Sequence, residues 1–133
     1  MATEQAGKVI VTYARGWQSL AVTRSLGRRG VDVITADEVA LTPASFSKYS
    51  KGSFTYPDCS KNPEEFLDKL ESEIIEHKPN DPETPYVLMP IHKETYLIAK
   101  HRERFEPHIR VPVPSIEQIE EVHNKGTLAA YAQ

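Results

Sequence analysis

The stretch from Lys8 to Asp37 constrains the fold of this chain more than any other part of the sequence. It contains a β-branched run at 9–11, a short turn, helical apolar spacing over 17–26, a glycine break and a second strand-like run at 31–36. This order is typical of a βαβ unit, in which a right-handed crossover joins two parallel strands. The turn after the first strand and the acidic end of the second then face the carboxyl edge of the sheet, where open α/β sheets bind ligands.

The rest of the sequence continues this alternation of strands and helices. Three further strands are predicted from short apolar or β-branched runs at 54–57, 86–91 and 109–113. Three further helices are predicted to begin at Pro63, at Lys93 and at Ser115, the second of them ending near Phe105. Gln118 completes a capping box with Ser115. We therefore predict an α/β domain with a Rossmann-like three-layer arrangement and a mostly parallel sheet of about five strands.

The segments between these elements set the predicted boundaries. Residues 1–7 are small and polar and are expected to form a flexible tail. Residues 38–53 lack a sustained hydrophobic period and are expected to form a long loop, and long ordered loops are often functional. Residues 8–114 would form the α/β domain, and residues 115–133 a helical segment that opens another domain.

Composition excludes several classes of function. The chain has 133 residues, a formal net charge of −3 and 26% charged residues, so no overall basic field favours nucleic acid or an anionic membrane. Cys59 is the only cysteine, which suits a reducing compartment, and no apolar run approaches the roughly 18 residues of a membrane span. We therefore expect a cytoplasmic protein that contacts neither nucleic acid nor membrane.

The first turn invites comparison with a dinucleotide-binding loop. Gly16 follows the first strand, and Asp37 lies near the spacing of a ribose-binding acid. However, Ala14 and Ser19 occupy the first and third glycine positions, and Trp17 adds bulk where the backbone must approach a pyrophosphate. Amides at the helix N-terminus, with Arg15 beside them, still suit a small anion.

The predicted strand at 86–91 leads directly to two further candidates. His92 and Glu94 would lie at the same carboxyl edge as Arg15 and Asp37. An alternative is that Glu94 only complements the positive end of its own helix and that His92 is a solvated cap. The other histidines are scattered without metal-ligand spacing, so no metal site is expected.

Two basic clusters remain outside this group. Arg24, Arg28 and Arg29 lie toward the end of the first helix, and Lys48 and Lys51 belong to the long loop. We interpret both clusters as solvated basic surface. The three arginines also suit the negative end of their helix.

Taken together, these segments resemble the N-terminal domain of ATP-grasp enzymes of the carboxylate–amine ligase and carbamoyl-phosphate synthase large-subunit type. The resemblance rests on the order and spacing of VIVTYARGWQSLAVTRSLGRRGVDVITAD, LTPASFSKYSKGSFTYPD, YVLMPIHKE, HRERF and HNKGTLAAYAQ. It covers the chain from Lys8 to Gln133. The first turn is poorer in glycine than is usual in the family, and Asn124 stands where an aspartate often precedes the family lysine.

The resemblance implies one part of an ATP-dependent ligase that activates a carboxylate as an acyl phosphate, which an amine then attacks. The domains that hold ATP and Mg²⁺ would follow this one in cis, so the 133-residue chain alone is expected to be inactive and to bind neither cofactor tightly. No catalytic residue is expected here. Lys125 matches the lysine that contacts ATP phosphates, and the residues expected to line the carboxylate and amine sites are Arg15, Gly16, Asp37, Ser45, Tyr49, His92 and Glu94.

Two other functions stay open at this point. The chain could be a Rossmann-type nucleotide or dinucleotide module, or a non-catalytic interaction domain of flavodoxin-like topology. A homodimer is compatible with all three interpretations.

Overall fold

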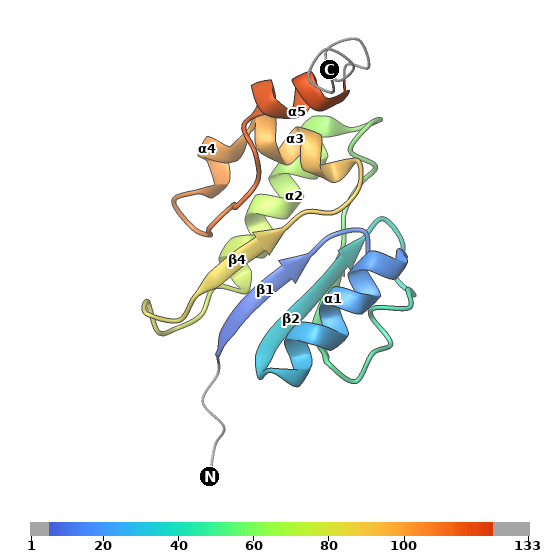
Figure 1. Cartoon of the computed structure of the whole chain (residues 1–133), viewed down its shortest axis with the longest axis vertical. Helices are drawn as coiled ribbons and strands as arrows, with labels where there is room; N and C mark the ends of the chain where they lie inside the picture. Colours follow the sequence, from blue (N-terminus) through green and yellow to red (C-terminus); the bar gives the residue numbers. More distant parts are fainter. Residues whose placement is uncertain (1–5, 124–133) are drawn as a thin grey trace, which may run out of the picture.

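The computed structural model describes residues 6–123, in which four parallel strands form one sheet (Figure 1). The strand order is β3–β2–β1–β4. The strands are β1 (Gly7–Val11), β2 (Val31–Asp37), β3 (Ser50–Thr55) and β4 (Tyr86–Met89). The helices of this part of the chain are α1 (Trp17–Arg28), α2 (Pro63–Glu76), α3 (Glu94–Lys100), α4 (Arg102–Phe105) and α5 (Ile116–His123). The predicted α/β class and parallel sheet are confirmed.

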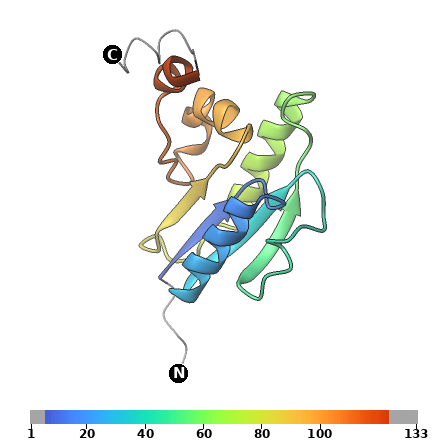
Figure 2. The same ribbon diagram turned by 45° about the vertical axis from the view of Figure 1, so that its right-hand side comes forward.

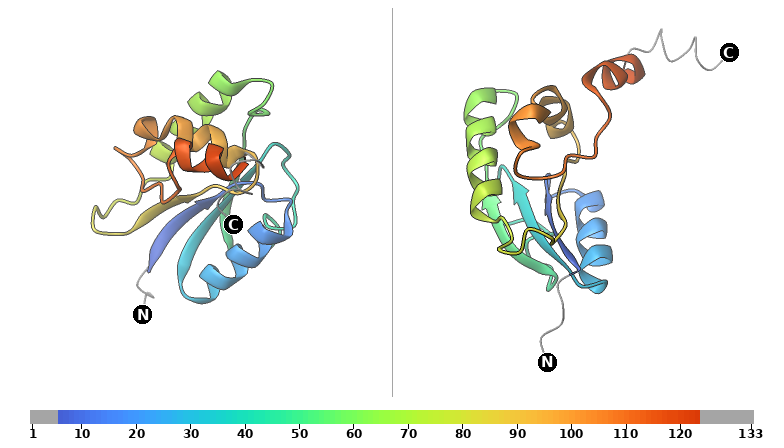
Figure 3. Two further views of the ribbon diagram at one scale, coloured as in Figure 1. Left: turned by 45° about the horizontal axis from the view of Figure 1, so that its top comes forward. Right: turned by 90° about the vertical axis from the view of Figure 1, so that its left-hand side faces the viewer.

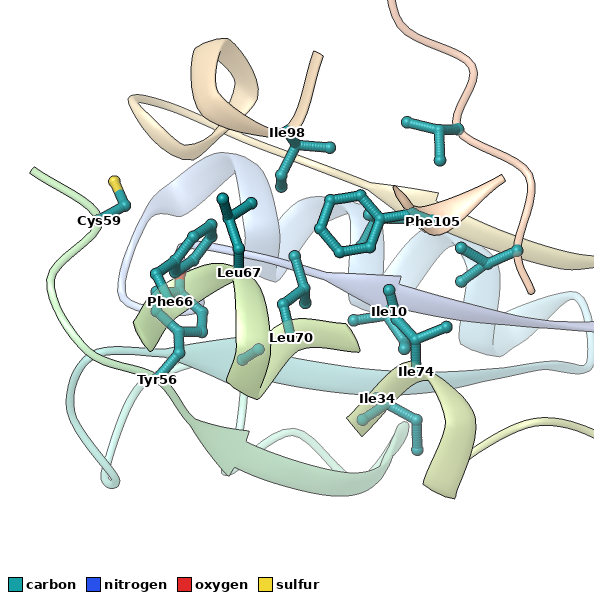
Figure 4. Close-up of a cluster of buried hydrophobic side chains, with 14 of the residues drawn as sticks. Ile10, Ile34, Tyr56, Cys59, Phe66, Leu67, Leu70, Ile74, Ile98 and Phe105 are labelled. Atoms are coloured by element: carbon teal, nitrogen blue, oxygen red, sulfur yellow. The ribbon is translucent and has the colours of Figure 1, made fainter. Parts of the chain in front are cut away.

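Helices cover the two faces of the sheet unequally. Helix α1 lies on one face and α2 on the other, as the edge-on view shows (Figure 3). On the α2 side, Leu70 and Ile74 of α2 pack with Ile98 of α3 and Phe105 of α4 in the main hydrophobic core (Figure 4). A smaller cluster around Val9, Val11 and Val33 lies on the α1 side. These helices and the sheet form the three layers that the sequence predicts.

Strand β1 is an interior strand of the sheet, and its side chains are apolar on both faces. Ile10 belongs to the main core, whereas its neighbours Val9 and Val11 face α1. The strand pairs in parallel with β2 on one side and with β4 on the other. A β-branched run buried on both faces is typical of an interior parallel strand.

The predicted fifth strand at 109–113 is not formed. Arg110 makes one isolated parallel bridge to Val87, in which Leu88 N donates to Arg110 O and Arg110 N donates to Tyr86 O. The ladder goes no further because Pro112 and Pro114 have no N–H to donate. Pro112 and Pro114 lie just after the single bridge at Arg110, where the pairing with β4 ends.

Three predicted boundaries also change. Strand β3 covers 50–55 rather than 54–57, so the loop before it is 38–49. The helix expected from Lys93 to Phe105 is divided into α3 and α4 at His101, whose ψ of 28° is not helical. Gly7, assigned to the tail by its polar surroundings, is the first residue of β1. Residues 1–5 lie outside the described part of the chain.

The capping box at Ser115 is confirmed. Ser115 N donates to the Gln118 side-chain oxygen at 2.9 Å, and Gln118 N donates to Ser115 Oγ at 3.2 Å. These two bonds satisfy amides at the start of α5. The assignment of residues 115–133 to the start of another domain stays a prediction. No helix between residues 6 and 123 is long and apolar enough to cross a bilayer.

The loop at 38–49 returns the chain from the carboxyl edge to the amino edge beside α1 (Figure 2). Its last residue, Tyr49, packs directly against Gly27 of α1. A β-carbon at position 27 would lie 2.3 Å from the Tyr49 β-carbon, which real structures do not allow. The absence of a side chain at Gly27 therefore lets the loop approach the helix.

We expect Gly27→Ala to destabilise the chain although alanine favours helices. The gain in helix propensity is about 1 kcal/mol, whereas displacing a packed ring and its backbone costs about 1 to 3 kcal/mol or more. Urea unfolding should show a lower free energy of unfolding for this variant. Gly7→Ala is the control, because its β-carbon would lie 3.4 Å from the nearest atom. Equal stability of Gly27→Ala and the wild type would contradict the close contact.

Candidate functional site

The connections of the sheet change direction between β1 and β4. The chain passes from β1 to β2 and then β3 on one side, whereas β4 lies on the other side of β1. In open α/β sheets, ligands bind outside the carboxyl ends of the strands at such a switch point. The segments after Val11 and Met89 therefore form the candidate ligand site of this sheet.

Tyr13 and His92 lie at this point, and both have an unusual backbone conformation. Their φ values are 54° and 69°, in the left-handed region that residues other than glycine seldom adopt. Their rings stack with centroids 4.3 Å apart and planes 24° apart. Each such residue costs of order 1 kcal/mol or more and persists only where its surroundings hold it, which is common at functional sites.

Thr12 holds the two strained segments together. Its buried hydroxyl donates to Ile91 O at 3.1 Å and accepts from Ile91 N at 2.7 Å. Its carbonyl oxygen accepts from Ser19 Oγ at 2.7 Å, which also ties it to α1. The end of β1, the segment after β4 and the first turn of α1 are thus fixed by one residue.

A chain of buried hydrogen bonds through Tyr56 and Glu94 holds the backbone of Tyr13. Tyr13 N donates to the Tyr56 hydroxyl oxygen at 3.2 Å, and that hydroxyl donates to Glu94 Oε2 at 2.9 Å. The Glu94 side chain is only 1% exposed, and Cys59 Sγ lies 3.9 Å from its other oxygen. Burial raises the pKa of Glu94, and the bond from Tyr56 partly offsets the rise. Glu94, expected at the substrate surface, is thus an internal anchor in this structure.

Arg15 and Asp37 form an ion pair at the same edge. Arg15 N donates to Asp37 Oδ2 at 2.9 Å, and Arg15 Nε lies 3.3 Å from Asp37 Oδ1. A second pair joins Arg15 Nη2 to Glu38 Oε2 at 3.4 Å. Burial opposes the charge, but the two carboxylates raise the pKa of Arg15 overall. The two predicted site residues are therefore brought together as a pair.

Lys93 extends this network to a further loop. Its Nζ lies 3.0 Å from Glu38 Oε1 and 3.2 Å from Asp58 Oδ1. The contact with Glu38 is the main cause of the raised pKa of Lys93. A backbone amide from Ser60, followed by Lys93, lowers the pKa of Asp58. The two cations and three carboxylates of this network thus leave one net negative charge and no unpaired cation among them.

Gly16 makes room for the Tyr13 ring. A β-carbon at Gly16 would lie 2.6 Å from Tyr13 Cδ1 and Cε1. Gly16 is the N-cap of α1, no side chain caps the helix, and its first turn contains no acidic residue. The turn is therefore fixed by aromatic packing, and the positive end of α1 is not neutralised by a side chain of that turn.

The remaining predicted residues do not all reach this edge. Ser45 closes a local turn by donating its hydroxyl to Thr42 O at 2.8 Å, and Ala44 N donates to Ala14 O, so this part of the loop lies against the first turn. Tyr49 directly precedes β3 and lies at the opposite, amino edge, because β3 runs parallel to β2. Lys125 lies outside the described residues.

Sequence reasoning missed several members of this site, namely Thr12, Tyr13, Glu38, Tyr56, Asp58 and Lys93. A signal for Tyr13 was present, since an aromatic residue directly follows the central strand, but a positive φ has no sequence signature outside glycine and asparagine. Within residues 6–123, no group of three or more His, Cys, Asp or Glu side chains could hold a metal ion.

The geometry argues against the dinucleotide alternative. Asp37 is 1% exposed, and both of its oxygens already contact Arg15 or the amide of Glu38. A ribose-binding acid needs a free oxygen toward the ligand. The Tyr13 ring also occupies the space over Gly16 that a pyrophosphate would require.

We expect Glu94→Gln to stabilise the chain at neutral pH. The amide still accepts the bond from Tyr56 but carries no charge to desolvate. Because the folded pKa of Glu94 is raised, its stabilising effect is present below about pH 4.5 and is lost as pH rises through the folded value. Urea unfolding between pH 5 and 8 should show the wild type falling below Glu94→Gln by about 1 kcal/mol. The exposed Glu103→Gln is the control, and a constant difference across pH would contradict this assignment.

We expect His92→Gly to be more stable than His92→Ala. Both variants lose the stack on Tyr13, but only glycine adopts a φ of 69° without strain. The difference in unfolding free energy should be about 1 kcal/mol in favour of glycine, measured by urea titration. An advantage for alanine would show that position 92 relaxes to an ordinary conformation.

Comparisons with known proteins place this fold. No protein-family model matches the chain, and no curated protein matches it. Among solved structures, an L-amino acid ligase from Bacillus licheniformis is similar with a TM-score of 0.67 and 13% sequence identity. The match covers 96% of this chain and 28% of that chain. At this identity the likeness shows the fold: nearly the whole of this chain folds like one part of a much longer ligase.

Proposed function

We propose that this chain is the N-terminal domain of an ATP-dependent carboxylate–amine ligase and forms the substrate-side wall of its active-site cleft. The observation that carries this proposal is the fold likeness, which covers 96% of the chain but only 28% of an L-amino acid ligase. The sequence resemblance independently suggests a ligase of the same general kind. A ligase that joins amino acids uses one as the carboxylate and the other as the amine.

The charge balance at the carboxyl edge supports a substrate wall rather than a nucleotide site. Arg15 is paired with Asp37 and Glu38, and Lys93 is paired with Glu38 and Asp58. Phosphate groups are normally bound where cations exceed acids or where several amides converge. ATP and Mg²⁺ would accordingly be held by the rest of the protein, with Lys125 as the contribution of this chain.

The residues of the wall would position the substrate and exclude water. Tyr13 and His92 present a rigid stacked surface, and Arg15 with the start of α1 offers donors beside it. Preorganised groups of this kind lower the entropic cost of bringing two reactants together. Activation of the carboxylate by phosphoryl transfer would be supplied by ATP and Mg²⁺ when bound.

The longer gene product is the direct test of this proposal. We expect codons after Gln133 to encode a nucleotide-binding half, and the whole protein to release ADP from ATP when two amino acids are supplied. His92→Ala in that protein should raise KM for one amino acid at least about tenfold, since a rigid wall is lost, whereas Lys61→Gln should not. A stop codon directly after Gln133, or no ADP release with any amino acid pair, would refute the ligase proposal.

We expect the 133-residue chain alone to release no ADP. We also expect no micromolar binding of ATP in calorimetry, because the cations at the carboxyl edge are already paired. The whole gene product is the positive control. Micromolar affinity of the chain alone, with amide shifts in ¹H–¹⁵N spectra at residues 13–16 and 92–94, would place the nucleotide site at this edge and contradict its assignment to the substrates.

A further inference from the structure

Three exposed cations lie together at the other end of α1 from the candidate site. Arg24 and Arg28 lie one helical turn apart and are exposed, and neither forms an ion pair within residues 6–123. Lys48 of the loop is also exposed, and its Nζ lies 5.1 Å from the centroid of the Tyr49 ring. Arg24 and Arg28 of one predicted basic cluster and Lys48 of the other therefore share one surface in the fold.

These side chains line a groove between α1 and the end of the 38–49 loop. The groove has a volume of about 380 Å³, within the range of small-molecule sites. No acidic residue lines it. Its lining residues are Arg24, Arg28, Phe46, Ser47, Lys48 and Tyr49. A second groove, of about 410 Å³ and also without an acid, shares Arg24 and Arg28 and continues toward Arg29.

The packing of the loop fixes the shape of the groove. Tyr49 is pressed onto α1 at Gly27, so the loop cannot move away from the helix without losing this contact. The three residues before Tyr49, at 46–48, form the side of the groove that faces Arg24 and Arg28. Phe46 lies on this side of the groove with 73% of its surface exposed, and it is among the most exposed large apolar residues of the described chain. The exposed Phe46 ring therefore offers a face on which a planar ligand group could stack, next to three cations.

We propose that this groove binds a nucleoside diphosphate, with its phosphates on Arg24, Arg28 and Lys48 and its base against Phe46. A guanidinium group can donate two parallel hydrogen bonds to the oxygens of one phosphate group. The three cations of the groove carry more positive charge than one phosphate group needs, so they suit a diphosphate. A planar base has the stacking face that an exposed phenylalanine accepts. A purely inorganic anion would leave Phe46 unused.

The groove is separate from the proposed substrate wall. Trp17 at the start of α1 and Arg28 at its end are roughly 16 Å apart along the helix. The two sites share no lining residue, so the groove can be tested whether or not the ligase proposal holds. Because the cations are solvent-exposed, we expect a dissociation constant of about 0.1 to 1 mM at low salt rather than tight binding.

Titration of the 133-residue chain with ADP, pyrophosphate and inorganic phosphate tests this proposal. Calorimetry gives the affinities, and amide shifts in ¹H–¹⁵N spectra locate the site. We expect ADP to bind at least about fivefold more tightly than pyrophosphate, with shifts at 24–29 and 46–49. Arg24→Gln with Arg28→Gln should weaken ADP at least about tenfold, and Phe46→Ala should abolish its advantage over pyrophosphate.

The control variant removes two exposed lysines elsewhere, Lys61→Gln with Lys100→Gln, and so changes the net charge equally. It should bind ADP within about twofold of the wild type, which separates the groove from a general charge effect. Lys48→Gln is a second groove variant if the double arginine variant does not fold. Equal binding of ADP and pyrophosphate, unchanged binding in the groove variants, or shifts confined to residues 14–19 would each overturn the proposal.

Discussion

The hydrogen bonds of Thr12 are the interaction on which the candidate site depends. This fully buried residue directly follows β1, and its hydroxyl satisfies both the N–H and the C=O of Ile91 beyond β4. Its own carbonyl oxygen accepts from Ser19 of α1, while its amide donates to Met89 O. A buried polar side chain with all its partners in place rigidifies its surroundings, whereas the loss of one partner is costly. The switch point is therefore held by specific polar bonds in addition to apolar packing.

This rigidity explains how two residues with positive φ are tolerated side by side. Tyr13 is constrained by Thr12 before it, by the bond of its amide to Tyr56 and by the absence of a side chain at Gly16. His92 directly follows Ile91, whose backbone Thr12 clamps. The strain is thus balanced by bonds in the protein interior, and the two rings are held in one orientation. The substrate wall that we propose would need this property, since a loosely held wall would not reduce the entropy cost of bringing two reactants together.

The sequence predicted the parts of the fold that depend on local pattern. β1, β2, β4, α1, α2 and the capping box at Ser115 follow from apolar period, β-branching and cap residues, and they occur close to the expected positions. The fifth strand was not formed because pairing depends on N–H groups that Pro112 and Pro114 lack. At the site, the pairing of Arg15 with Asp37 agrees with the expected edge, but the burial of Glu94 depends on long-range contact with Tyr56 and Cys59. No local pattern encodes such contacts.

The position of Tyr49 shows how topology decides which end of the sheet a loop residue serves. Because β3 is parallel to β2, the chain must return from the carboxyl edge to the amino edge before β3 begins, and here a loop rather than a helix makes this return. Two contacts hold this loop in place. Ala44 N donates to Ala14 O, and the Tyr49 side chain packs against Gly27. The first contact keeps Ser45 near the carboxyl ends of β1 and β4, and the second places Tyr49 at the C-terminal end of α1. The residues between these two points lie beside the unpaired arginines of that helix because of this geometry.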